Sequence, residues 1–248
     1  MRIALLADIH ANLWALEAVL DHAQRHNASH FLNLGDISYG PLKPRATFDR
    51  LMKEDVAMTI QGNQDRLLYQ ATTEEVSLNP TLRFVLQDLG DEPIAWLRRL
   101  PKTAVYEKEI FLCHGTPASD MEYLLEDVTS GKPEVRSERE IARLLGEISS
   151  PVIVCGHTHV PRVVRLSSVQ LIVNPGSVGL PAYEDTKPVP HAMEMFSPHA
   201  CYAILERTRF GWDVSLERVA YDHEAAAQQA RVLGREDWAH ALATGRVV

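Results

Sequence analysis

Two histidines one residue apart, at the end of an apolar run, have the residue types and spacing of a metal site. The run from Pro151 to Cys155 is predicted to be a buried strand that ends at Gly156. Side chains at positions i and i+2 of an extended segment lie on the same side, so His157 and His159 can point at one place. Because neutral imidazole is the commonest metal ligand among side chains, the pair calls for further ligands elsewhere in the chain.

Polar residues follow four other apolar runs in the same way. With the histidine pair they form a set of two carboxylates, one amide oxygen and four imidazoles: Asp8, His10, Asp36, Asn63, His114, His157 and His159. This mixture of donors suits two borderline divalent ions such as manganese, iron or zinc, whereas magnesium and calcium prefer oxygen alone. A carboxylate can bridge two such ions when they lie roughly 3.5–4 Å apart.

Each motif also has an ordinary structural interpretation when it is taken singly. An Asp-x-His sequence is more often a hydrogen-bonded turn, and Gly-Asp and Gly-Asn are common turn sequences. His114 could be a core histidine whose ring is satisfied by the fold. The metal interpretation depends on the whole series, in which five polar clusters close five apolar runs.

The elements that must position these residues alternate between strands and helices. Apolar runs at 3–7, 31–34 and 56–60 are predicted strands, Asn12 can cap a helix that includes Leu16 and Leu20, and 45–53 has a helical pattern. This alternation is typical of a mostly parallel sheet. The carboxyl ends of parallel strands share one edge, where ligands bind, so the candidate ligands are expected to meet there.

The rest of the chain has both helical and extended patterns. Helices are predicted at 81–89, 93–100, 122–127, 137–145, 222–233 and 235–243, and strands at 103–106, 110–113, 160–166, 169–173, 201–206 and 212–219. Residues 180–199 are rich in proline and are predicted to be a loop. We expect a single domain, residues 1–248, with the helical insert 67–100 and the loop 180–199 as candidates for a substrate-selecting rim.

Composition and charge exclude several classes of protein. The chain is 46% hydrophobic, which is ordinary for a globular protein with a core, and its formal net charge is -8. That charge argues against a nucleic-acid partner, since phosphate binding needs a basic surface. Three cysteines in or beside apolar runs are expected to be buried free thiols of a reducing compartment.

Location follows from the absence of targeting patterns. No apolar run reaches the roughly 18 residues that a membrane helix needs, and the first residues lack a signal-peptide pattern. We therefore expect a soluble cytoplasmic protein with no membrane partner. The oligomeric state, including a homo-oligomer, is left open.

As a series, the motifs resemble those of the calcineurin-like metallophosphoesterase superfamily, and most of all its small bacterial and archaeal phosphodiesterases. The resemblance is carried by Asp8-Ile9-His10, Gly35-Asp36, Gly62-Asn63-Gln64-Asp65, His114-Gly115 and Gly156-His157-Thr158-His159. It spans about residues 1–179, and the helix start at Asn12 and the turn at Asn174-Pro175-Gly176-Ser177 agree with it. The implied fold is a four-layer αββα sandwich of two mixed sheets flanked by helices.

The resemblance also implies a dinuclear site and a reaction. One ion would be held by Asp8, His10, Asp36 and His159, and the other by Asp36, Asn63, His114 and His157, with Asp36 as the bridge. A hydroxide between the ions would attack a small phosphoester in line, with Asp36, Asn63, Gln64 and His114 as the catalytic residues. Asn63, Gln64 and Arg66 are candidates for substrate binding, although a surface ion pair is a common alternative for Arg66. Asp65 could orient His10 or another ligand, or cap the following helix.

One position departs from the family pattern. Many members have a histidine where this chain has Gln64, and that histidine is thought to help the leaving group depart. Glutamine can donate a hydrogen bond to a phosphoryl oxygen, but it cannot donate a full proton near neutral pH. Relatives without the histidine tend to be phosphodiesterases, and His191 or His199 could reach over the site as a substitute acid.

Three functions therefore compete. The leading hypothesis is a metal-dependent phosphodiesterase that acts on a small phosphoester. An alternative enzyme would hydrolyse a dinucleoside polyphosphate or another nucleotide. A non-catalytic scaffold of the same fold is disfavoured, because such scaffolds lose ligands and this chain retains all seven.

Overall fold

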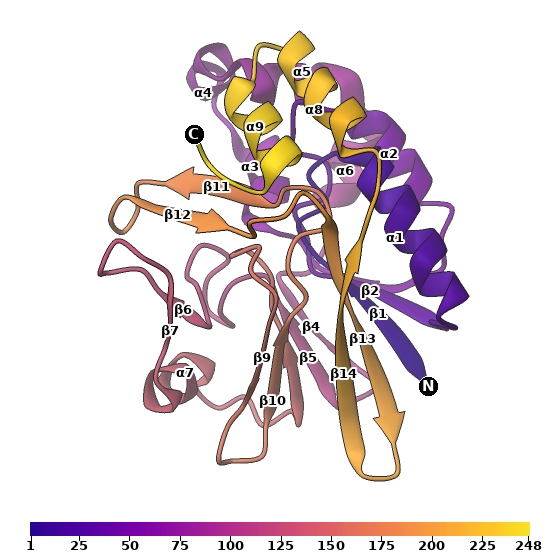
Figure 1. Ribbon diagram of the computed structural model, residues 1–248, viewed down its shortest axis with the longest axis vertical. Coiled ribbons are helices and arrows are strands. Elements are labelled where there is room, and N and C mark those ends of the chain that lie inside the picture. Colours follow the sequence, from indigo (N-terminus) through magenta and orange to yellow (C-terminus); the bar gives the residue numbers. More distant parts are fainter.

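The computed structural model describes all residues, 1–248, and contains two five-stranded sheets packed face to face between helices (Figure 1). The first sheet has the order β14 (Gly211–Val219), β13 (Ala200–Thr208), β1 (Arg2–Leu6), β2 (His30–Asn33), β3 (Val56–Thr59). The second has the order β4 (Thr103–Tyr106), β5 (Ile110–Cys113), β8 (Val152–Val154), β10 (Leu171–Asn174), β9 (Arg162–Arg165). Strands β1 to β3 are parallel, as are β5, β8 and β10, whereas β13, β14, β4 and β9 pair antiparallel with their neighbours. The predicted sandwich of two mixed sheets is confirmed.

The core between the sheets follows from the alternation of side chains along each strand. In β1, Ile3 and Leu5 belong to the layer between the sheets, whereas Ala4 and Leu6 face the helices. Each fully buried leucine stabilises the fold by about 2 kcal/mol. Packing on both faces of β1 therefore holds its end, and the residues that follow it, in one place.

Helices cover the outer face of the first sheet and continue beyond its end. They are α1 (Leu13–Arg25), α2 (Pro44–Leu51), α3 (Asn63–Gln70), α4 (Thr73–Leu78), α5 (Pro80–Leu89), α6 (Asp91–Leu97), α8 (His223–Val232) and α9 (Glu236–Thr244). Asn12 caps α1 as predicted, because its Oδ1 accepts the N–H of Ala15 at 3.1 Å. Buried Leu16 and Leu20 then lie on the face of α1 that packs against the sheet.

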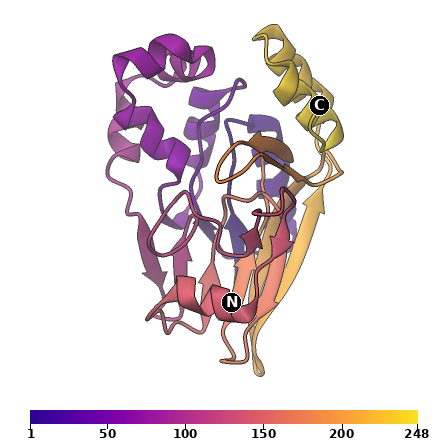
Figure 2. The same cartoon turned by 90° about the vertical axis from the view of Figure 1, so that its left-hand side faces the viewer.

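The outer face of the second sheet is covered by α7 (Glu138–Leu145), through Ile141 and Leu145. The helix begins with the predicted capping box of Ser137 and Glu140. Two small hairpins complete the fold: β6 (Glu126–Asp127) with β7 (Glu134–Val135), and β11 (Ala182–Asp185) with β12 (His191–Glu194). In Figure 2 the purple helices of the insert and the yellow C-terminal helices lie at the same end of the molecule.

Two local predictions are wrong. Residues 122–127 are not a helix: Leu124 and Leu125 are buried because they cover the second sheet, and the segment ends in β6. Residues 180–199 are not a loop throughout, because Ala182 pairs with Glu194 in the hairpin β11–β12. In both cases contacts distant in sequence decide the conformation, and proline content or local periodicity does not report them.

One expectation from composition is met. Cys113, Cys155 and Cys201 are buried free thiols. None of the helices combines the length and the apolar character that crossing a membrane requires.

Candidate metal centre

The seven candidate ligands gather where parallel strands of both sheets end. Asp8 and His10 follow β1, Asp36 follows β2, and Asn63 begins α3 after β3. The other three follow strands of the second sheet: His114 after β5, and His157 and His159 after β8. All except half-buried Asn63 are at most 8% exposed. Both sheets therefore contribute ligands to the site, whereas the order of strands in the sequence suggested that all ligands follow strands of one sheet.

The backbone at the site is strained. Five of the seven candidate ligands have positive φ angles, between 50° and 70°: Asp8, His10, Asp36, His157 and His159. This conformation costs a residue other than glycine roughly 1 kcal/mol. Hydrogen bonds between loops offset the strain, for example from the Asp8 N–H to the Gly35 carbonyl and from the His10 N–H to the Asp36 carbonyl, both 3.0 Å. Such strain is typical of functional sites, where loops must present side chains to one point.

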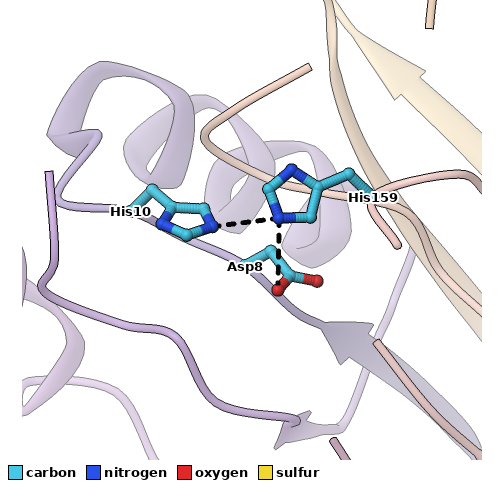
Figure 3. A group of neighbouring side chains, drawn as sticks. All are labelled: Asp8, His10 and His159. Carbon is cyan, nitrogen blue, oxygen red and sulfur yellow. Dashed lines mark hydrogen bonds and ion pairs between the residues drawn. The ribbon is translucent and has the colours of Figure 1, made fainter. Parts of the chain in front are cut away.

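A first group of ligands consists of Asp8, His10 and His159 (Figure 3). The Nδ1–H of His10 donates to the Tyr39 carbonyl at 3.1 Å, and that of His159 to the Leu180 carbonyl at 2.7 Å. In neutral rings these bonds leave each Nε2 as an unprotonated acceptor. Nevertheless the two Nε2 atoms lie 3.0 Å apart, and Asp8 Oδ1 lies 3.5 Å from the Nε2 atom of His159.

With both rings neutral, no proton lies among these acceptors, so they face one another at a cost. Asp8 Oδ1 is buried and has no hydrogen-bond partner at all. An unpaired buried acceptor costs about 1–3 kcal/mol, and more when it is charged. A cation at this point would remove the cost, which is why these residues fit a metal ion.

A second group consists of Asp8, Asp36 and His114. The Nδ1–H of His114 donates to the Leu34 carbonyl at 2.8 Å, which directs Nε2 toward oxygens. That Nε2 lies 3.0 Å from Asn63 Oδ1, 3.5 Å from Asp36 Oδ2 and 3.9 Å from Asp8 Oδ1. Asp8 is thus common to both groups, and a bridge through Asp36 stays a prediction.

His157 adjoins the second group, with its ring centroid 5.1 Å from that of His114. Its Nε2–H donates to the Met121 carbonyl at 3.2 Å, so Nδ1 is the atom left for a ligand. Its backbone N–H donates to Asp8 Oδ2 at 3.1 Å. His157 therefore orients Asp8 in addition to offering a donor of its own.

The charges of the site are unevenly distributed. Burial lowers the pKa values of His10 and His157 to about 4, so both rings are neutral at pH 7 and can bind a metal ion through their free nitrogens. Burial would also lower the pKa of His114, but the Asp36 carboxylate outweighs it and raises that pKa to about 10. Without metal, one proton is thus held between His114 and Asp36, in a place that a divalent ion would take.

Asp65 holds the loop that carries Asp36. Its carboxylate accepts the backbone N–H groups of Asp36 at 2.7 Å, Ile37 at 2.9 Å and Gly62 at 3.0 Å. Burial, with the Asp36 charge, raises the pKa of Asp65 to about 7. Asp65 makes no hydrogen bond to His10. Its carboxylate joins the loop after β2 to the first turn of α3, and its bond from the Gly62 N–H is the helix-capping role that was the alternative.

Gln64 and Arg66 lie on α3 beside the site, in different environments. The Gln64 backbone N–H donates to Asp36 Oδ1 at 2.8 Å, and its side chain lines a cavity of about 410 Å³ next to Asp36 and His159. Arg66 forms a two-point ion pair with Asp120, at 2.6 and 2.9 Å, and lines a second cavity of about 300 Å³ beside His114. Arg66 thus forms an ion pair, which was the alternative to its predicted role in substrate binding.

The larger cavity has walls that the sequence reasoning missed. Trp238 and Ala241 from α9, with Tyr39, line it, and Leu180 to Asp185 supply the wall from the predicted rim 180–199. No residue of the insert 67–100 lines this cavity, although Gln70 lines the smaller one. His191 and His199 line neither, and His191 Nε2 instead lies 3.0 Å from the Tyr123 hydroxyl. Helical periodicity signals that Trp238 is buried, but not against what.

Comparison with known proteins agrees with this geometry. The sequence profile described as the calcineurin-like phosphoesterase superfamily domain matches residues 1–194. A metallophosphoesterase from Sphaerobacter thermophilus is 28% identical, with a TM-score of 0.77 over 99% of this chain and 100% of that one. A hypothetical protein from Pyrococcus horikoshii OT3 is 19% identical, with a TM-score of 0.79 over 100% of this chain and 99% of that one, and shares the fold. A comparison with curated protein sequences found no significant match.

The profile covers most of the chain, including every candidate ligand. The fold of two mixed sheets, the Asp and His groups that could hold metal, and the matched profile lead to the same family. This chain belongs to the calcineurin-like phosphoesterase superfamily.

Proposed function

We propose that this protein is a phosphodiesterase that requires two divalent metal ions. The observation that supports it most is the convergence of metal-binding atoms at two neighbouring points, where the buried Asp8 Oδ1 has no hydrogen-bond partner. Such an arrangement is destabilising in a chain that never binds a cation, and stabilising in one that does. A scaffold without metal would have no physical reason to retain it.

The ions would be held by the seven residues predicted from sequence: Asp8, His10, Asp36 and His159 for one, and Asp36, Asn63, His114 and His157 for the other. Imidazole, amide and carboxylate donors together suit manganese, iron or zinc. When bound, such ions supply positive charge to the phosphoryl oxygens and lower the pKa of the water that attacks phosphorus.

The protein side chains orient the substrate and exclude water from it. Asn63 and Gln64 lie where the cavity meets the metal centre, so their amides can bind phosphoryl oxygens. Gln64 cannot protonate the leaving alcohol. We therefore propose that the enzyme favours esters whose alcohol leaves without a proton, and diesters over monoesters.

The test is metal content followed by activity. Elemental analysis of the purified protein should find close to two manganese, iron or zinc ions per chain. Exhaustive chelation should abolish hydrolysis of bis(p-nitrophenyl) phosphate, and manganese should restore it. His10→Ala should reduce both bound metal and activity, whereas His26→Ala, which removes an exposed histidine at the end of α1, should change neither.

Full diesterase activity after chelation would refute the proposal. So would a loaded His10→Ala variant with unchanged metal content. Activity on p-nitrophenyl phosphate that exceeds activity on the diester would leave a metal-dependent esterase but overturn the preference for diesters.

The domain organisation and the cellular compartment of the protein are also proposals. We propose that residues 1–248 form one domain, since β1 near the start pairs with β13 near the end, Ile3 opposite Leu205. Three buried free thiols support a reducing compartment such as the cytoplasm. A truncated chain that ends at residue 194 should therefore be insoluble, because it lacks two strands of the first sheet.

A further inference from the structure

The cavity beside the metal centre has an apolar wall that the proposed reaction does not use. Its volume of about 410 Å³ is in the range of small-molecule sites. Helix α9 supplies Trp238 and Ala241, and Tyr39 and Tyr183 lie on other walls. The Trp238 indole packs edge to face on the His10 ring, with 5.8 Å between centroids. The apolar wall therefore begins at a candidate metal ligand and extends outward.

The rim of the same cavity is acidic. Arg235 is its only Lys or Arg residue, and Arg235 is already held by Asp237, with Nη2 and Oδ2 2.6 Å apart. Glu184 and Asp185, on β11, form no ion pair. Outside the metal centre, the cavity therefore has an uncompensated charge of about two carboxylates and no free cation.

We infer that this cavity binds one ester group of the substrate, and that this group is an apolar, preferably aromatic, alcohol without negative charge. The inference rests on the proposed function, because a phosphodiester on the metal centre must direct an ester group somewhere. A second phosphate is excluded from this cavity, because no unpaired Lys or Arg lines it and two carboxylates repel it. Trp238 is the specificity-determining residue for the apolar group.

The expected effects are modest and measurable. Packing an aromatic ring against the wall that Trp238 shares with Ala241 and Tyr183 should strengthen binding by about tenfold relative to a methyl group. Two carboxylates at a solvated rim should weaken binding of an added anionic group by about tenfold, and salt should reduce that penalty. A positively charged group should bind at least as tightly as a neutral one.

The test measures binding rather than turnover. Titration calorimetry on the manganese-loaded protein would compare methylphosphonate with three phenylphosphonates that carry a para methyl, aminomethyl or carboxylate group. Each ligand has one organic group, and the three aromatic ones differ mainly in charge. We expect the methyl and aminomethyl compounds to bind about tenfold more tightly than both methylphosphonate and the carboxylate compound.

Two variants assign the effects to the cavity. Trp238→Ala should remove the advantage of phenyl over methyl, and Trp238→Phe should retain most of it. A ratio of two ligands on the same protein cancels any change in metal loading. The double variant Glu184→Gln, Asp185→Asn should bring the carboxylate compound to within about threefold of the methyl compound. Glu17→Gln, an exposed carboxylate on α1, is the matched control and should leave the penalty intact.

The outcomes separate the inference from the function beneath it. Equal affinity for all three phenylphosphonates, or a carboxylate penalty that survives the double variant, would overturn the inference and leave the phosphodiesterase proposal standing. A phenyl advantage unchanged in Trp238→Ala would do the same. If no phosphonate binds the loaded protein, methylphosphonate included, both the proposed function and this inference are wrong.

Discussion

Without metal, the protein should lose stability between about pH 7 and pH 8.5, mainly because of one residue, His114. Burial lowers the pKa of this ring, but the Asp36 carboxylate outweighs burial and raises the pKa from an ordinary 6.5 to about 10. A histidine whose pKa is raised on folding stabilises the folded state fully below its unfolded pKa. That contribution is lost as the pH rises from the unfolded value toward the folded one.

The size of the effect follows from the width of the window. His10 and His157, whose pKa values burial lowers to about 4, change their protonation on folding below pH 7. Asp65, whose pKa burial raises to about 7, and the three buried thiols, whose pKa values burial also raises, each lose a smaller contribution in the same direction. His114 therefore dominates the interval. At about 1.36 kcal/mol per pH unit, roughly 1.5 units correspond to about 2 kcal/mol.

Urea unfolding of the chelated protein across this interval measures the free energy of unfolding directly. The wild type should lose about 2 kcal/mol more than His114→Asn, which retains only the smaller contributions of Asp65 and the thiols. His26→Ala, which removes an exposed histidine, should behave as the wild type. Saturating manganese should abolish the loss, because the ion replaces the proton. A wild type with no loss, or an equal loss in His114→Asn, would show that no proton is held between His114 and Asp36.

Three further substitutions test the surroundings of the ligands. Asp65→Asn should destabilise the fold by about 1–3 kcal/mol in urea unfolding, because an amide cannot accept all three backbone N–H groups. Gly62→Ala should lower the metal content found by elemental analysis, since its Cβ would lie 2.1 Å from Asp36 Oδ1. Gln64→His should increase hydrolysis of phenyl phosphate, whose alcohol leaves poorly without a proton, about tenfold or more, and no increase would place residue 64 away from the leaving group.

The candidate ligands could be found from the sequence because their signal is local. An apolar run that stops at a polar residue marks a strand end, and Asp8, Asp36 and His114 each stand at one. The N-cap at Asn12 and the capping box of Ser137 and Glu140 are equally local, and both are confirmed.

The errors fall where distant contacts decide the structure. The hairpin β11–β12 forms because Ala182 and Glu194 pair, and no periodicity in 180–199 reports that pairing. Trp238 was predicted to lie on a helix, but its contact with the ring of His10 joins residues 228 positions apart. The ion pair that occupies Arg66 likewise depends on Asp120, which lies on a loop of the second sheet.

The sequence by itself determined which donor atoms this protein offers, because residue types and strand ends are written along the chain. Only the tertiary structure decided which atom of each histidine is free to bind, because the other nitrogen is taken by a backbone carbonyl, that of Tyr39, Leu34, Met121 or Leu180. It also decided what surrounds the site. The β11–β12 pairing and the wall of the cavity are formed by segments that meet only when the chain folds. The free energy of that packing is not encoded in any one segment.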